Sequence, residues 1–312
     1  MTELQRYLAE EVAEDHADGI ITRREAMRRL GLLGVTGAAA TSLLAASSGG
    51  AEAARAREVS GRGKGASRGP RDVEWAPVAT EAITFPGPRG TLMAAWALAE
   101  RPRGGVLVIH ENRGLNDHIR SVAGRFAASG YSALAIDLLS EEGGTGAFPG
   151  EAEVAAALAA ISPERFVADM KAGVAELEHR VPGKRVAAIG FCFGGGRVWL
   201  LLTSGERRLA AAAPFYGPFP EGGTLGRSKT AVLGIYAGLD DRVNATRDAA
   251  RAAVEAARLE HQFVTFTEAD HAFFNDTGAR FNPAAMAEAY HRVLNWFDRF
   301  VAGRGDGTDK DD

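Results

Sequence analysis

Apolar and polar positions alternate in blocks along the middle and C-terminal parts of the chain. Short, continuous apolar runs are typical of strands covered on both faces, and they occupy residues 106–110, 131–139, 185–190, 232–237 and 263–267. Helical patterns alternate with these runs at 118–129, 162–180, 195–203, 245–259 and 283–301. Gly130 is a good C-cap for the first helix, and Ser162 with Pro163 forms a typical start for the second. The order of these elements predicts an α/β fold, with a mainly parallel sheet and helices on both faces.

The first fifty-three residues have a different pattern. A twin-arginine pair, Arg23-Arg24, precedes a weakly apolar run at 30–46 that is rich in Gly, Ala and Leu. Ala51-Glu52-Ala53 then has the small-x-small pattern that signal peptidase cleaves. Together these features resemble a twin-arginine (Tat) export signal. We therefore expect residues 1–53 to be a Tat-type signal segment, with the Tat machinery as partner and a periplasmic or extracellular destination.

Two other structures for the run at 30–46 remain open. One is a membrane-spanning helix, although the run is at the short end for crossing a hydrocarbon core of about 30 Å. The other is a buried helix of a globular unit, for which its several glycines are unfavourable. The signal interpretation is preferred, so we expect no stable membrane span in the mature chain.

Composition divides the remaining chain into a linker, a domain and a tail. Residues 54–72 are rich in Arg, Gly and Ser, which favours a basic flexible linker over a basic arm for nucleic acid or anionic lipid. Residues 303–312 are rich in Gly and Asp and are typical of a disordered tail. The segment 73–302 remains, and its size suits a single α/β domain.

Composition and charge exclude several classes of function. The chain has 312 residues, of which 46% are hydrophobic and 24% are charged, as in an ordinary globular protein. The net charge of −4 argues against nucleic-acid binding. The one cysteine, Cys192, permits no intramolecular disulfide and no cysteine-based zinc site. A metal group composed of His110, Glu111, Asp117 and His118 matches no known ligand spacing, so we expect neither a metal nor another cofactor.

Cys192 lies between a predicted strand and a predicted helix, in the sequence Gly190-Phe191-Cys192-Phe193-Gly194. This is the pattern of a nucleophile elbow, with cysteine in place of the usual serine. The glycines permit a strained turn, and the following helix N-terminus favours a thiolate. A buried, inert thiol is the alternative, but the position at the centre of the elbow favours a nucleophile.

The other members of a catalytic triad are expected where later strands end. His271 follows the last predicted strand and is the candidate base. Asp240 and Asp241 follow the strand at 232–237, and we choose Asp240 because it comes directly after the Gly238-Leu239 turn. The order of nucleophile, acid and histidine is the order expected in an α/β-hydrolase.

Two backbone N–H groups are expected to form an oxyanion hole. One belongs to Asn112, in the loop that follows the strand at 106–110, and the other to Phe193, directly after the nucleophile. Both groups lie at strand ends, which meet at the same edge of a parallel sheet.

These residues resemble the dienelactone hydrolase (carboxymethylenebutenolidase-like) family of α/β-hydrolases, from about residue 84 to residue 301. The motifs that carry the resemblance are His110-Glu111-Asn112-Arg113-Gly114, Gly190-Phe191-Cys192-Phe193-Gly194-Gly195, Gly238-Leu239-Asp240 and His271-Ala272-Phe273. The resemblance implies an α/β-hydrolase fold and the hydrolysis of a carboxylic ester or lactone. It implies a Cys192, Asp240 and His271 triad that forms an acyl-thioester. It also implies that Glu111 holds the thiol in the free enzyme and accepts its proton when substrate binds.

The predicted substrate site departs from this family in one residue. Family members that process dienelactone carry an arginine four residues past the histidine, where this chain has Asn275. A neutral amide cannot form a charge-assisted contact with a carboxylate, so another ester or lactone is as good a candidate as dienelactone. Arg113 and Asn275 are the candidate substrate-binding residues, and Arg165 and Arg197 are also conceivable. A thioesterase or acyltransferase with the same triad and a non-catalytic ligand-binding relative are the alternative functions.

Overall fold

The computed structural model describes residues 1–47, 76–226 and 228–303, and the chain divides into two compact units. One unit comprises Met1–Arg71 with Phe148–Ile161, and the other comprises Asp72–Ala147 with Ser162–Asp312. The predicted linker at 54–72 and nearly all of the predicted tail at 303–312 lie outside the described residues. The predicted boundaries at these positions therefore stay predictions.

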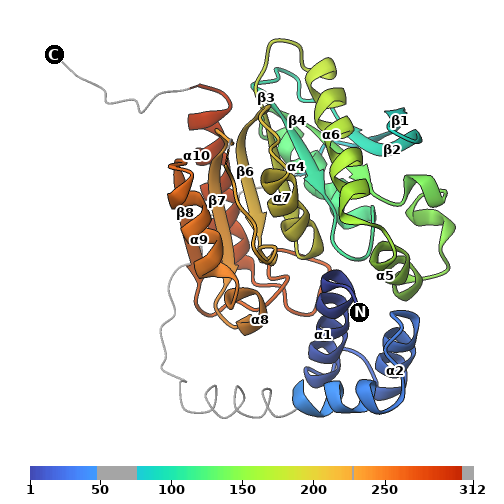
Figure 1. Ribbon diagram of the computed structural model, residues 1–312. Helices are drawn as coiled ribbons and strands as arrows, with labels where there is room; N and C mark the ends of the chain where they lie inside the picture. Colours follow the sequence, from blue (N-terminus) through green and yellow to red (C-terminus); the bar gives the residue numbers. More distant parts are fainter. Residues whose placement is uncertain (48–75, 227, 304–312) are drawn as a thin grey trace. The chain divides into compact units, whose positions relative to one another are not determined.

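An eight-stranded sheet forms the centre of the larger unit, in the order β1-β2-β4-β3-β5-β6-β7-β8 (Figure 1). The strands are β1 (Glu81–Gly87), β2 (Gly90–Ala97), β3 (Gly104–Ile109), β4 (Tyr131–Asp137), β5 (Val186–Phe191), β6 (Leu209–Phe215), β7 (Ala231–Ala237) and β8 (His261–Phe266). β1 and β2 form an antiparallel hairpin, and β2 is also antiparallel to β4. The pairs from β4 through β8 are parallel. The predicted α/β fold with a mainly parallel sheet is confirmed.

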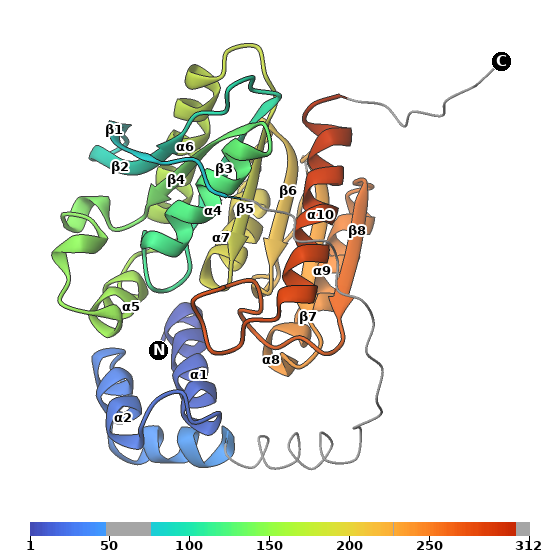
Figure 2. The ribbon, with the colours of Figure 1, turned by 180° about the vertical axis from the view of Figure 1, so that it is seen from behind.

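Helices cover both faces of this sheet. They are α4 (Asp117–Ala128), α6 (Pro163–Arg180), α7 (Phe193–Thr203), α8 (Asp241–Asn244), α9 (Arg247–Ala256) and α10 (Pro283–Phe300). α6, α7 and α9 lie on one face, and α4 and α10 lie on the other (Figures 1 and 2). Two short 3-10 turns, η1 (Ser140–Glu142) and η2 (Thr145–Ala147), follow β4. Because the central strands are covered twice, β3, β4, β5 and β7 are buried along their whole length.

Three strands were not predicted from the sequence. β1 and β2 lie at one edge of the sheet; β1 is mostly exposed, whereas β2 is exposed only at its first two residues. β6 has the sequence Leu-Ala-Ala-Ala-Ala-Pro-Phe, and neither alanine nor proline favours a strand. The helix predicted at 245–259 corresponds to α9, and the short helix α8 directly before it was not predicted. The position of β6 between β5 and β7 matters most, since its C-terminal end lies beside the candidate site.

The smaller unit is helical among its described residues. It contains α1 (Glu3–Ala17), α2 (Arg23–Leu32), helical residues 37–47 and α5 (Glu151–Ala159). Thr22 caps α2, so the twin-arginine pair occupies the first turn of this helix. Arg28 of α2 pairs with Glu25 of its own helix and with Glu153 of α5, over 3.0 and 2.5 Å. The Tat signal and the export that it would direct stay predictions.

In the described part of the chain, none of the helices combines the length and the apolar character needed to cross a bilayer.

Candidate active site

Cys192 lies at the junction of β5 and α7, on the edge of the sheet where the parallel strands end. Its backbone has φ 56° and ψ −121°, in a region that non-glycine residues rarely occupy. The backbone N–H of Cys192 donates to the carbonyl oxygen of Phe215 over 3.1 Å. The side chain is 2% exposed. Cys192 therefore occupies the strained strand-to-helix turn that the glycine pattern predicted.

The glycines around Cys192 are required by close approaches of backbone atoms. A Cβ atom at Gly190 would lie 2.2 Å from the carbonyl oxygen of Gly194. A Cβ atom at Gly194 would lie 2.3 Å from the carbonyl oxygen of Ile109, and one at Gly195 would lie 2.2 Å from that of Phe215. Backbone atoms cannot move aside as a flexible side chain can. The glycines thus hold the start of α7 tightly against the ends of β3 and β6.

His271 and Asp240 form a buried pair beside Cys192. Nδ1 of His271 lies 2.6 Å from Oδ2 of Asp240, and the two side chains are 2% and 1% exposed. Oδ1 of Asp240 accepts a hydrogen bond from the N–H of Val243 over 3.0 Å. A ring nitrogen of His271 lies within 4.8 Å of Sγ of Cys192. The structure therefore brings all three predicted triad residues together, whereas Asp241 is an exposed residue at the start of α8.

The charges of this group stabilise one another. Burial by itself lowers the pKa of His271, but the charges of Asp240 and Cys192 and the hydrogen bonds to them hold it well above its ordinary value. Burial raises the pKa of Asp240, but the charge of His271 and its hydrogen bond hold that pKa below its ordinary value. An imidazolium that is stabilised in this way can balance a thiolate on Cys192.

Glu111 is buried in the loop that follows β3, and its main partner is Asn275. Nδ2 of Asn275 donates to Oε2 of Glu111 over 2.7 Å. Oδ1 of Asn275 accepts from the backbone N–H and the hydroxyl of Thr277, over 3.0 and 2.7 Å. Both ends of the Asn275 amide are thus engaged within the protein. Oε1 of Glu111 is buried and has no hydrogen-bond partner within the described ranges.

The two candidate donors of an oxyanion hole lie at the start of α7 and in the loop that follows β3. Phe193 is the first residue of α7, where backbone N–H groups have no acceptor within the helix. Asn112 and Arg113 are half-buried in the loop that follows β3. The roles of the Asn112 and Phe193 N–H groups and of Arg113 stay predictions.

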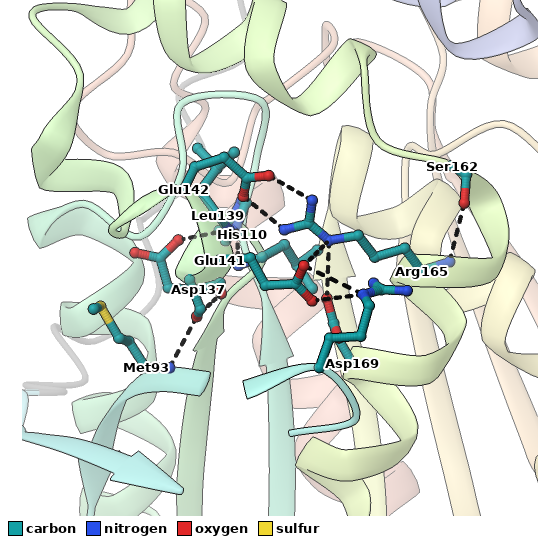
Figure 3. A network of polar contacts seen from close by, with 12 residues as sticks. Met93, His110, Asp137, Leu139, Glu141, Glu142, Ser162, Arg165 and Asp169 are labelled. Atoms are coloured by element: carbon teal, nitrogen blue, oxygen red, sulfur yellow. Dashed lines mark hydrogen bonds and ion pairs between the residues drawn. The ribbon is translucent and has the colours of Figure 1, made fainter. Parts of the chain in front are cut away.

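His110 connects the loop after β3 to the end of β4 (Figure 3). Its Nδ1 donates to the carbonyl oxygen of Glu111 over 2.6 Å, and its Nε2 accepts from the N–H of Leu138 over 3.2 Å. Burial lowers the pKa of His110, which favours the neutral ring that these two bonds require. Both ring nitrogens of His110 are therefore used by the backbone.

Arg165, which was considered as a substrate arginine, is part of the polar network in Figure 3. It pairs with Glu142 over 2.5 Å, with Glu141 over 3.5 Å and with Asp169 over 3.6 Å. Arg197, the other such candidate, lies with its guanidinium over the rings of Phe166 and Phe193. Neither arrangement was visible in the sequence, because the partners come from different elements.

The segment after His271 is attached to α4 by a second set of contacts that was not predicted. Oδ1 of Asp276 lies 3.0 Å from Nδ1 of His118, and Oδ2 of Asp276 pairs with Arg125. These contacts, with the charges of His118 and Arg125, lower the pKa of Asp276. The sequence offers His118 only as a possible metal ligand. Its sequence position gives no signal for this contact, since Asp276 lies 158 residues away.

Tyr216 is a further site residue that was not predicted. It directly follows β6, and its ring centroid lies 5.2 Å from that of His271. The signal that could have found it is the Tyr216-Gly217 pair at the end of an apolar run, but that run was not recognised as a strand.

Comparison with known proteins supports one family. The model of the dienelactone hydrolase family matches residues 92–301. Proteins of Synechocystis sp. and Escherichia coli O157:H7, both named "Putative carboxymethylenebutenolidase", are 31% and 29% identical to this chain. These alignments cover 70% of this chain and 96% of the first protein, and 62% of this chain and 76% of the second.

A solved structure shows the same relationship. The dienelactone hydrolase-like promiscuous phosphotriesterase from metagenomic libraries superposes with a TM-score of 0.60 at 26% identity. The superposition covers 72% of this chain and 100% of that protein. The matched region contains the elbow, Asp240, His271 and the loop after β3. The chain therefore belongs to the dienelactone hydrolase family of ester and lactone hydrolases.

Proposed function

We propose that this protein hydrolyses a carboxylic ester or a lactone through a triad of Cys192, His271 and Asp240. The observation that carries the proposal is the buried bond of 2.6 Å between His271 and Asp240, with a ring nitrogen of His271 within 4.8 Å of Sγ of Cys192. A nucleophile, a base and a group that orients the base are the parts that covalent acyl transfer requires.

In the acylation step, the Cys192 thiolate attacks the acyl carbon of the bound substrate. The carbonyl oxygen becomes an oxyanion, which the N–H groups of Phe193 and Asn112 would stabilise. The bond between the acyl carbon and the leaving oxygen then breaks, and His271 gives its proton to that oxygen. The product of this step is an acyl-thioester on Cys192.

In the deacylation step, neutral His271 takes a proton from a water molecule as the water attacks the thioester. The carbon–sulfur bond breaks, the acid product leaves and the thiolate with the imidazolium is restored. Asp240 keeps Nδ1 of the ring protonated and stabilises the positive charge in both steps.

Glu111 is proposed to control the protonation of Cys192. Its support is a buried carboxylate whose Oε1 has no hydrogen-bond partner among the described residues. Such an oxygen can accept the thiol proton. Glu111→Gln is therefore expected to change the pH dependence of Cys192 alkylation by iodoacetamide, and an unchanged profile would remove this role.

The substrate is proposed to lack a carboxylate at the place where dienelactone carries one. Asn275 stands at the family's arginine position, and its amide is already bonded to Glu111 and Thr277. A substrate carboxylate there would meet no positive charge from residue 275 and would lie near the carboxyl group of Glu111. Neutral esters and lactones are the favoured class.

The direct test is hydrolysis of p-nitrophenyl acetate and of a panel of neutral lactones. Cys192→Ala and His271→Ala should each lower the rate by at least a thousandfold. His261→Ala, at a half-buried histidine on β8, is the matched control and should keep the wild-type rate. Mass spectrometry of the stalled enzyme should find the acyl group on Cys192. Full activity of either triad variant would refute the proposal.

We also propose that residues 1–53 direct export through the Tat pathway. The support is the twin-arginine pair with the apolar run and the Ala51-Glu52-Ala53 pattern that follow it. Replacing both Arg23 and Arg24 by lysine should leave the protein in the cytoplasm, whereas Arg28→Lys should not. Equal export of the wild type, the double lysine variant and Arg28→Lys would contradict the signal.

A further inference from the structure

Tyr216 is held in an unusual backbone conformation at the end of β6. Its φ of 32° lies in the left-handed region, which is strained for a non-glycine residue. Its N–H donates to the carbonyl oxygen of Ile235 over 2.7 Å. A Cβ atom on the next residue, Gly217, would lie 2.1 Å from the backbone nitrogen of Gly196, so α7 closely constrains this turn. The fold therefore fixes the position of the Tyr216 side chain.

Within the described structure the buried Tyr216 hydroxyl makes no hydrogen bond of ordinary geometry, although the backbone of Phe274 lies close enough to act on it. The residue is 1% exposed, and its ring packs against His271 and Phe273 with centroids 5.2 and 5.3 Å apart. A buried donor without an acceptor is destabilising, because it has lost its hydrogen bonds to water. Strain and a missing partner thus coincide at one residue, next to the candidate base. Such costs are tolerated mainly where a group has a function.

The surroundings keep this hydroxyl protonated. Burial raises the pKa of Tyr216 well above its ordinary value, and the negative charges of Glu111 and Cys192 raise it further. The phenol therefore keeps its proton at neutral pH and can act as a hydrogen-bond donor. It lies close enough to both Glu111 and Cys192 for their charges to act on it.

We infer that Tyr216 is a further catalytic residue, whose hydroxyl donates a hydrogen bond to the leaving oxygen of the bound ester or lactone. The inference rests on the proposed function, since it assigns a role within that reaction. The oxyanion is already assigned to the backbone N–H groups of Asn112 and Phe193, so Tyr216 is assigned to the other oxygen, the leaving one. Tyr216 packs instead against the ring of His271, which delivers the proton to the leaving oxygen.

The step balances without a proton from Tyr216. Sγ of Cys192 forms a bond to the acyl carbon while the bond from that carbon to the leaving oxygen breaks. The electron pair goes to the leaving oxygen, and the proton comes from the His271 imidazolium. Tyr216 keeps its own proton and stabilises the negative charge that develops on the leaving oxygen before the proton arrives.

This role predicts a dependence on the leaving group. p-Nitrophenolate is a stable anion, so its leaving oxygen needs little stabilisation by a hydrogen bond. The ethoxide that leaves from ethyl acetate is a much less stable anion and needs more. In full-length protein, Tyr216→Phe should lower kcat/KM for ethyl acetate by about tenfold to a hundredfold. For p-nitrophenyl acetate the loss should be less than about threefold. A residue that only supports the fold would reduce both values equally.

Tyr236→Phe is the matched control. The Tyr236 hydroxyl is also buried and has no partner within the described residues, but its ring stacks on Phe263 of β8 and lies beside charged residues of α9. Each phenylalanine variant removes an unpartnered hydroxyl, so both proteins should melt at or above the wild-type temperature. The Tyr236 variant should keep wild-type activity on both esters.

The outcomes separate the inference from the proposed function. A loss that grows with the pKa of the leaving alcohol supports the inference. An equal loss on both esters, no loss, or a melting temperature lowered by several degrees in Tyr216→Phe overturns it. Cys192→Ala reports separately on the proposed function: if this variant hydrolyses both esters at the wild-type rate, the reaction assigned to the site is wrong, and the role of Tyr216 in it is wrong too.

Discussion

The side-chain amide of Asn275 donates a hydrogen bond of 2.7 Å to Oε2 of Glu111, from a residue 164 positions away in the chain. Glu111 is buried, and its other oxygen has no hydrogen-bond partner among the described residues. This contact connects the loop after β3 to the segment that carries His271. The residue at position 275 therefore supports a carboxylate of the protein itself.

Replacing Asn275 by leucine is expected to destabilise the protein by about 2–3 kcal/mol. The substitution removes the donor from a buried carboxylate, and hydrogen bonds to charged groups contribute on this scale. Urea unfolding at pH 7 measures the effect. Asn282→Ala, which removes the N-cap of α10, is the control: it should cost about 1 kcal/mol and leave the rate of Cys192 alkylation unchanged. Wild-type stability of Asn275→Leu would contradict the structural role.

Asp240→Asn is expected to lower kcat for ester hydrolysis by about a thousandfold to ten-thousandfold. An asparagine no longer stabilises the imidazolium and allows the wrong tautomer of His271. Steady-state kinetics with p-nitrophenyl acetate would measure this loss. Asp241→Asn, at an exposed position next in the chain, is the control and should be nearly as active as wild type.

The same variant should also change how stability depends on pH. The pKa of His271 is raised in the fold, so its contribution is complete below the ordinary value of 6.5 and is lost as the pH rises through the raised value. The pKa of Asp240 is lowered, so its contribution is complete above the ordinary value of 3.8 and is lost as the pH falls. The stability difference between wild type and Asp240→Asn should be largest between these two values and smaller at pH 10. A difference that grows above pH 8 would contradict the pairing.

Asp276→Asn is expected to lower kcat by about tenfold, with little change in KM. The substitution weakens the attachment of the His271 segment to His118 and Arg125 of α4, so the base is held less accurately. Asp276→Glu should recover part of the activity. The control is Glu288→Gln, which removes an exposed pair with Arg292 and should have almost no effect. A proportional loss of stability with unchanged kcat would show that the contact is structural alone.

Asp169→Asn is expected to stabilise the protein at neutral pH, by at most about 3 kcal/mol. Burial and the nearby charge of Glu141 raise the pKa of Asp169 to about 6, although Arg165 and Arg89 oppose the shift. A raised pKa of an acid means that the fold disfavours its ionised form, so the penalty is absent below the ordinary value of 3.8 and complete above about 6. Urea unfolding at pH 4.5 and pH 8 should show a larger gain at pH 8. A gain that is greater at pH 4.5 would contradict the assignment.

The central strands could be predicted from the sequence because both of their faces are buried. β3, β5 and β7 are continuous apolar runs, and the cover of helices makes such runs obligatory. The elbow was also predictable, since Gly190, Gly194 and Gly195 form a compact pattern around Cys192, although Gly194 and Gly195 are required by backbone atoms of the distant residues Ile109 and Phe215. In both cases the pattern that can be recognised lies within a few neighbouring residues.

The remaining parts depend on contacts between distant residues. β6 is a strand because β5 and β7 lie on either side of it, whereas its alanines carry little preference of their own. Tyr216 enters the site through that strand. The contacts of Asp276 with His118 and Arg125 of α4 cross more than 150 residues of sequence, and no local pattern records them.

The helical unit combines α2, near the start of the chain, with α5, which lies between β4 and α6. Arg28 and Arg29 of α2 pair with Glu153 and Glu151 of α5. Proteolytic removal of residues 1–53 would take both arginines away and leave the two glutamates of α5 without them. Such a cleavage would change the surface that α5 presents. A partner that recognises α5 would therefore distinguish the precursor from the processed form.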